Sequence, residues 1–136
     1  MHTIDEMNAW SPGTFPGLLG LETTGIAQGL VEMRMEIRPE MLAPNGYLHA
    51  AVVVALADTA CGYGTRSHYP PGGTSFTTIE LKSNFLGTAR EGALTCVATL
   101  AHGGRTTQIW DATVRDAKSG KTLALFRCTQ LIIYPK

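Results

Sequence analysis

A single aspartate, Asp58, lies in the middle of NGYLHAAVVVALADTACGYG (residues 45–64), a stretch that is otherwise almost free of charge. If the stretch is helical, the residues three and four positions from Asp58 are valine, alanine, cysteine and glycine, so its face is small and apolar. Charged side chains are rarely buried without a partner. One interpretation is that Asp58 faces solvent or bonds a nearby hydroxyl. The neighbours favour another, a catalytic carboxylate whose pKa is tuned by an apolar pocket.

The start of the same helix could polarise a carbonyl group. Asn45 and Gly46 predict a turn just before Ala50. The first N–H groups of a helix lack intrahelical partners and carry partial positive charge, which suits a carbonyl oxygen that becomes an oxyanion. The alternative is an ordinary helix N-terminus with His49 near the cap.

The spacing of these two features is informative. Ala50 and Asp58 are eight residues apart, which is about 12 Å along a helix. One acyl carbon cannot lie within reach of both groups. Either Asp58 has another role, or the helix N-terminus that works with it belongs to a second chain. Two such helices packed antiparallel across a two-fold axis would form two equivalent sites at a dimer interface.

Other catalytic patterns are absent from the sequence. The four histidines show no metal-ligand spacing, no GxSxG motif occurs, and no glycine-rich phosphate loop is complete. Cys61 is expected to behave as a small buried hydrophobe rather than a nucleophile. The segment Gly104-Arg105-Thr106 either contacts a phosphate or forms a polar hairpin corner.

The elements that must position these residues follow from hydrophobic periodicity. A short helix is expected over residues 3–9, ended by SPGTFPG, and a strand over residues 31–38, which alternates apolar and charged side chains. The long helix is expected from about residue 49 to 64. Four antiparallel strands follow, with hairpin turns at Gly103-Gly104 and Ser119-Gly120. One sheet wrapped around one central helix is an α+β fold.

Composition limits the functional class. The 136 residues carry a formal net charge of zero, which argues against nucleic-acid binding and favours self-association. The three cysteines are widely spaced, so we expect a reducing cytoplasm rather than disulfides. No signal peptide is expected at the N-terminus, and the longest apolar run is too short to cross a membrane.

The sequence resembles the hotdog-fold thioesterases, and most closely the PaaI-type (phenylacetate degradation) and 4-hydroxybenzoyl-CoA thioesterase branch. The similarity rests on GYLHAA (residues 46–51), on LADTA (residues 56–60), and on TTIELKSNF and HGGRTT later in the chain. It implies a single hotdog domain over residues 1–136, in which residues 1–16 are an N-terminal extension. It also implies a dimer with a continuous sheet, often paired into a tetramer, and hydrolysis of an acyl-CoA thioester.

The resemblance also implies roles for individual residues. Asp58 would act as nucleophile or general base, and the Ala50 N–H of the partner subunit would polarise the carbonyl. His49 would orient the loop or the carbonyl, and Thr78 would position water or Asp58. No metal or further cofactor is implied, because coenzyme A is part of the substrate. The residues expected to contact substrate or CoA are Gly46, Lys82, Arg90, Gly104, Arg105 and Thr106.

The sequence departs from the family pattern at two places. First, His49 is followed by two alanines instead of the usual two glycines. Second, Ala43 stands where many relatives have an asparagine. Asn45, two residues later, either supplies the missing amide or only forms the turn. Two alternatives stay open: a non-catalytic acyl-CoA-binding protein and an acyl-thioester hydratase or dehydratase. The acyl group is also open, since the pocket aromatics suit an aromatic group and a medium chain equally: Tyr47, Tyr63, Phe76 and Phe85.

Overall fold

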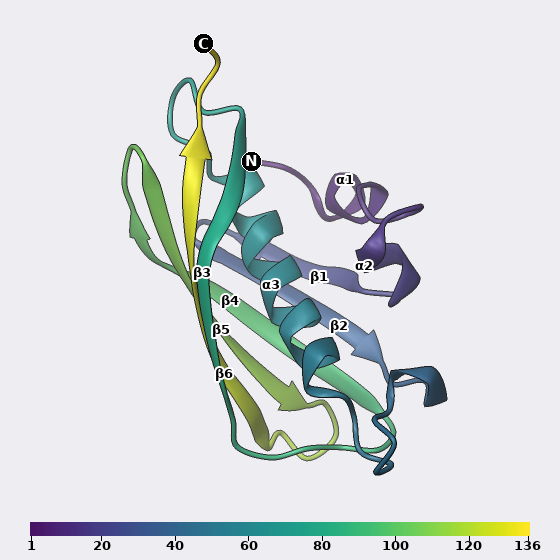
Figure 1. The fold of residues 1–136 in the computed structure, drawn as a ribbon. Helices are drawn as coiled ribbons and strands as arrows, with labels where there is room; N and C mark the ends of the chain where they lie inside the picture. The colour runs from purple at the N-terminus through teal and green to yellow at the C-terminus, as the bar shows by residue number, and fades with distance from the viewer.

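The computed structural model describes all residues 1–136. Figure 1 shows one long helix against the inner face of a curved antiparallel sheet, with two short N-terminal helices beside it. This hotdog arrangement confirms the predicted α+β fold. The elements are α1 (Ile4–Ala9), α2 (Phe15–Leu18), β1 (Glu22–Ala27), β2 (Leu30–Glu36), a 3₁₀ turn (Pro39–Met41), α3 (Ala50–Ser67), β3 (Ser75–Phe85), β4 (Ala93–Gly103), β5 (Thr107–Asp116) and β6 (Thr122–Ile133).

The order of the strands in the sheet is β1-β2-β4-β5-β6-β3. β3 follows α3 in the chain but pairs with β6, the last strand, so it forms one edge of the sheet. The outer side of β3 is free of strand partners over its 11 residues. A free strand edge of this length is a place where another chain can add a strand.

The alternation predicted for residues 31–38 is confirmed in β2, although the strand ends at Glu36. Val31, Met33 and Met35 are buried against the core, whereas Glu32 and Glu36 are exposed. β2 pairs with β1 on one side and β4 on the other, so the predicted strand is part of a hairpin. A period of two therefore identified both the strand and its buried face.

The long helix α3 begins at Ala50 and continues to Ser67, about one turn further than the sequence indicated. Gly62 and Gly64 lower helix propensity near the expected end, but tertiary packing stabilises this part. A Cβ atom at position 64 would lie 2.6 Å from the ring of Trp110, so the glycine allows the fully buried indole to pack against the helix. No helix of the structure is both long and apolar enough to cross a lipid bilayer.

The N-terminal segment forms more structure than the sequence predicted. The short helix α1 is present, and Thr3 caps it by accepting a hydrogen bond from the Glu6 N–H (3.1 Å). Residues 11–17, with their two prolines and two glycines, end this helix as predicted. The end of this stretch also begins α2 (Phe15–Leu18), because Pro16 occupies the first turn, where proline is tolerated. Met7 of α1 is fully buried in the same apolar core as α3.

Candidate active site

The turn before α3 sets the entry to the helix. Gly46 has a φ of +86°, a conformation that other residues rarely adopt. The Asn45 side-chain oxygen accepts a hydrogen bond from the Tyr47 N–H (3.1 Å), and the Gly46 N–H donates to the Ala43 carbonyl (2.8 Å). Asn45 therefore makes the turn, which is one of the two roles that its position left open.

His49 caps the helix. Its Nδ1 accepts a hydrogen bond from the Ala51 N–H (2.9 Å), so the neutral ring carries its proton on Nε2. The N–H of Ala50, by contrast, donates to no group of this chain, and Ala50 is exposed. Both alanines are compatible with the helix, because only glycines have positive φ in this structure.

A cavity of about 500 Å³ opens at this end of the helix. Its lining includes Asn45 from the turn and Ala50 from the start of the helix. On the other side it includes Phe85 at the end of β3 and Gly87 in the loop beyond. The unpaired Ala50 N–H is therefore available to a carbonyl group that enters here.

Asp58 occupies a second environment on α3. Its side chain is half-buried, and one carboxylate oxygen is fully buried with no hydrogen-bond partner. Burial removes water from the carboxylate and raises its pKa above the ordinary value. The buried oxygen neither faces solvent nor bonds a nearby hydroxyl. A carboxylate in this state is a stronger base than one in water and is suited to attack a carbonyl or to activate water.

The cavity beside Asp58, about 200 Å³ in volume, is separate from the one at the helix start. Five of its residues come from one face of α3, with α2 on one side and β3 on the other. Within one chain, the carboxylate and the free N–H therefore open into different cavities, as the helix spacing predicted. The residues that line the cavity with Asp58 are Pro16, Thr59, Gly62, Tyr63, Arg66 and Phe76.

Thr78 lies on the inner face of β3. Its hydroxyl donates a hydrogen bond to the side-chain oxygen of Gln130 (2.6 Å) on β6. Phe76, two residues earlier, lies against Gly62 of α3. β3 runs antiparallel to α3 (Figure 1), so moving forward along the strand corresponds to moving back along the helix. The two residues from Phe76 to Thr78 span about 6.6 Å, and the four residues from Gly62 back to Asp58 span about 6 Å. Thr78 therefore lies at about the level of Asp58.

Gln130 was not identified from the sequence. Its side chain is fully buried, and its amide nitrogen has no hydrogen-bond partner. The available signal was a polar residue at an inward position of the last strand, in alternation with the buried Cys128 and Ile132. A buried amide of this kind fixes the orientation of the Thr78 hydroxyl.

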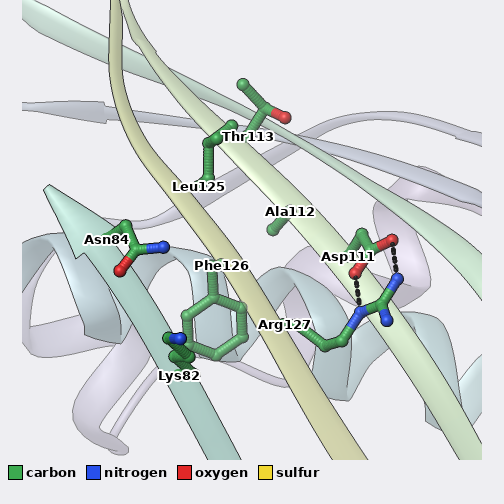
Figure 2. A pocket seen from close by; sticks show the side chains of 8 residues that line it. All are labelled: Lys82, Asn84, Asp111, Ala112, Thr113, Leu125, Phe126 and Arg127. Atoms are coloured by element: carbon green, nitrogen blue, oxygen red, sulfur yellow. Dashed lines mark hydrogen bonds and ion pairs between the residues drawn. The ribbon is translucent and has the colours of Figure 1, made fainter. Parts of the chain in front are cut away.

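The cations expected to meet CoA phosphates are not brought together within one chain. Arg90 stacks on Tyr47, 4.1 Å from its ring centroid, beside the cavity at the helix start. Lys82 lies on the outer face of the sheet, opposite α3, next to the Asp111–Arg127 ion pair (Figure 2).

The turn between β4 and β5 forms a polar hairpin corner. The Gly104 N–H donates to the Thr107 carbonyl (2.8 Å), and the Thr106 carbonyl accepts from the Ile132 N–H (2.8 Å). The Arg105 carbonyl accepts a hydrogen bond from the Tyr134 hydroxyl, and the exposed Arg105 side chain lines neither cavity on α3. A phosphate in this corner would depend on the Arg105 side chain, since the Gly104 N–H is already engaged.

The remaining reactive groups are buried in the core. Cys61, Cys96 and Cys128 are all free and buried. Burial raises the pKa of the Cys61 thiol well above its ordinary value, so this residue is not a nucleophile at neutral pH. No group of three or more His, Cys, Asp or Glu side chains lies close enough together to hold a metal ion.

Comparison with known proteins identifies the family of the chain. Residues 45–123, more than half of the chain, match the family model of the thioesterase superfamily. The chain is 31% identical to 1,4-dihydroxy-2-naphthoyl-CoA hydrolase of Listeria monocytogenes, over 82% of this chain and 89% of the relative. The chain therefore belongs to the thioesterase superfamily. It is a thioester hydrolase, and the family favours this reaction over the hydratase and binding-protein alternatives.

Two solved structures share the fold over nearly the whole chain. A thioesterase from Haemophilus influenzae has a TM-score of 0.91 at 25% identity, covering 98% of this chain and 92% of its own. The Escherichia coli PaaI protein from the phenylacetic acid degradation operon has a TM-score of 0.83 at 25% identity, covering 96% of both chains. The resemblance to PaaI-type hotdog thioesterases is confirmed.

Proposed function

We propose that this protein hydrolyses an aromatic acyl-CoA to the free acid and CoA, with each active site built from two subunits. One observation carries the proposal. The unpartnered Asp58 carboxylate and the unpartnered Ala50 N–H are the two groups that thioester hydrolysis needs, and they lie in different cavities of the same helix.

The chemistry divides between the two groups. The Ala50 N–H and the partial positive charge of the helix start bind the thioester oxygen and stabilise the oxyanion that forms on attack. Asp58 either attacks the acyl carbon to form an anhydride or removes a proton from the attacking water. CoA leaves as the thiolate in both routes. His49 holds the first turn of the helix in place through its cap.

A second subunit is needed to join the two groups. Antiparallel packing of two α3 helices brings Asp58 of one subunit to the Ala50 end of the other, and pairing of the free β3 edges would continue the sheet. Exposed apolar side chains on the outer face of β6 support a further pairing of dimers into a tetramer. They are Leu125, Leu131 and Ile133. Sedimentation at several protein concentrations tests this assembly, and a monomer at active concentrations would contradict it.

The aromatic acyl group is supported by the Listeria relative, which is named for a naphthoyl-CoA, and by the aromatic side chains beside Asp58. Thiol release from a series of aromatic and aliphatic acyl-CoA thioesters tests the proposal. We expect higher kcat/KM for the aromatic substrates. Preference for unbranched aliphatic chains would contradict the aromatic assignment without affecting the role of Asp58.

The two routes for Asp58 are distinguished by a rapidly quenched single turnover in ¹⁸O-labelled water, which reports both the label position and any acylated protein. If Asp58 is the nucleophile, the intermediate is a mixed anhydride of Asp58 and the acyl group. Water that attacks the aspartyl carbon leaves the label in Asp58, and water that attacks the acyl carbon leaves it in the product acid. Quenching before hydrolysis would then trap an acylated protein. If Asp58 is the general base, no acyl-protein forms, and the label appears only in the product acid.

A further inference from the structure

The face of α3 beside Asp58 carries more than the catalytic carboxylate. Asp58, Gly62 and Arg66 are four residues apart and lie one above the other, so they line a single strip of the helix. The strip has a carboxylate at one end and a guanidinium at the other. The proposed reaction uses the carboxylate end, and the aromatic walls suit the acyl group, which leaves the guanidinium end of the cavity without an assigned role.

The middle of this cavity has flat walls in fixed orientations. The Phe76 ring lies so close to Gly62 that a Cβ atom there would be 3.2 Å from the ring. Tyr63 is held from the N-terminal segment, because its hydroxyl hydrogen-bonds to the Ser11 hydroxyl (2.7 Å) and its ring meets the edge of Trp10 at 5.1 Å between centroids. Flat apolar walls that cannot rotate freely suit a planar ring.

The far end of the cavity holds an unpaired cation. The Arg66 guanidinium lies 4.0 Å from the ring centroid of Trp10. Its side chain is exposed and makes no ion pair and no hydrogen bond. Arg90, Arg105 and Arg115 also lack an ion pair, but Arg66 is the only arginine that lines the cavity with Asp58. Stacking on an aromatic face orients a guanidinium and leaves the N–H donors at its edge available to an oxygen ligand.

We propose that Arg66 is a specificity-determining residue, which binds an anionic or hydrogen-bond-accepting substituent on the aromatic acyl group, at the end remote from the thioester. The inference rests on the proposed function, because the acyl carbon must lie near Asp58. The acyl ring then extends along α3, between Phe76 and Tyr63, toward Arg66. Arg66 binds the substituent through charge-assisted hydrogen bonds and takes no part in the bond-breaking step.

The N-terminal segment is part of this specificity. Trp10 holds Arg66, Ser11 holds Tyr63, and Pro16 forms the opposite wall. None of these three residues contacts Asp58 through a hydrogen bond. The segment therefore defines which acyl group fits while leaving the catalytic carboxylate unchanged.

The test compares benzoyl-CoA, 4-hydroxybenzoyl-CoA and 4-carboxybenzoyl-CoA as substrates of the wild type, Arg66→Met and Arg66→Lys. For Arg66→Met we expect a loss of about 10- to 100-fold in kcat/KM with the carboxy substrate, a smaller loss with the hydroxy substrate, and a change of less than about twofold with benzoyl-CoA. Arg66→Lys keeps the charge without the planar fork and should retain part of the preference. Arg34→Met, which removes an ion-paired cation of β2 that lines neither cavity on α3, is the control and should leave all three values unchanged.

Each other outcome overturns the inference. An equal loss with all three substrates would mean that Arg66 binds CoA phosphates or supports the fold, and thermal unfolding separates these two causes. No loss with any substrate would remove Arg66 from recognition. Both results leave the proposed function intact, because Asp58-dependent hydrolysis continues. If the wild type hydrolyses none of the three substrates, aromatic acyl-CoA hydrolysis itself fails, and the specificity of Arg66 fails with it.

Discussion

The two halves of α3 differ in what they offer a substrate. The first turn, at Ala50, is exposed and presents an N–H donor, but no acid lies in its cavity. The middle of the helix, at Asp58, is half-buried and presents a carboxylate, but no helix N-terminus lies in its cavity. Each half lacks what the other has. Under the proposed function, one chain therefore carries two incomplete sites, and a second chain completes each of them.

Removing the carboxylate should have the largest effect. We expect Asp58→Asn to lower kcat about 10³-fold, the range for loss of a general base or nucleophile. The variant should fold as stably as the wild type or more so, because it replaces a buried, unpartnered charge by a neutral amide. Thiol release and thermal unfolding measure the two effects. Unchanged turnover would remove Asp58 from the mechanism.

Removing the donor at the helix start should have the next largest effect. Ala50→Pro eliminates the free N–H, and we expect kcat to fall about 10²-fold, as for loss of one oxyanion donor. Ala50 is the first helical residue, and His49 before it has extended backbone angles (φ −65°, ψ 133°), so proline fits this position. Ala50→Gly keeps the N–H and is the control. If both variants have equal kcat, the N–H does not bind the carbonyl.

The hydroxyl opposite Asp58 should matter less. Thr78→Val removes the donor to Gln130, whose side-chain oxygen then has no partner in the buried site. We expect unfolding free energy to fall by about 1–3 kcal/mol and kcat to fall about tenfold. Thr78→Ser keeps the hydroxyl and should retain most of both. Urea unfolding and steady-state kinetics check the prediction, and wild-type kcat in Thr78→Val would limit Thr78 to a structural role.

The smallest effect concerns pH. Burial raises the pKa of Asp58 in the folded state, so its contribution to stability is fully present below the ordinary pKa of 3.8 and is lost as pH rises through the raised value. The stability advantage of Asp58→Asn should therefore be largest near pH 7 and disappear as the pH falls toward 3.8. The acid limb of kcat/KM should lie above pH 3.8. An advantage that is constant with pH would contradict a raised pKa.

Much of the fold could be predicted because local patterns and tertiary packing agree. The alternation around Met33 and Met35 identified β2, and the alanine-rich stretch identified α3. The position of Asp58 among small apolar residues identified the buried carboxylate. These features are local, so one sequence contains them.

Other features depend on contacts between distant residues and could not be predicted. The pairing of β3 with β6, rather than with its neighbour in sequence, follows from packing around α3. The partnership of Thr78 with Gln130 spans 52 positions, and the contact of Trp10 with Arg66 joins the N-terminal segment to the end of α3. Tyr63 and Phe76 were expected to line a pocket and do line the cavity with Asp58, but the contributions of Pro16 and Arg66 to this cavity were missed for this reason.

The central claim is that Asp58 and Ala50 act together across two subunits. We would co-express Asp58→Asn and Ala50→Pro chains with different affinity tags and purify the mixed dimer by both tags. If each site combines Asp58 of one subunit with Ala50 of the other, one site of the mixed dimer carries both substitutions and the other carries none. The account therefore predicts about half of the wild-type kcat per dimer. If each site instead used Asp58 and Ala50 of the same chain, every site of the mixed dimer would carry one substitution and be inactive. A mixed dimer as inactive as the two homodimers would contradict the account.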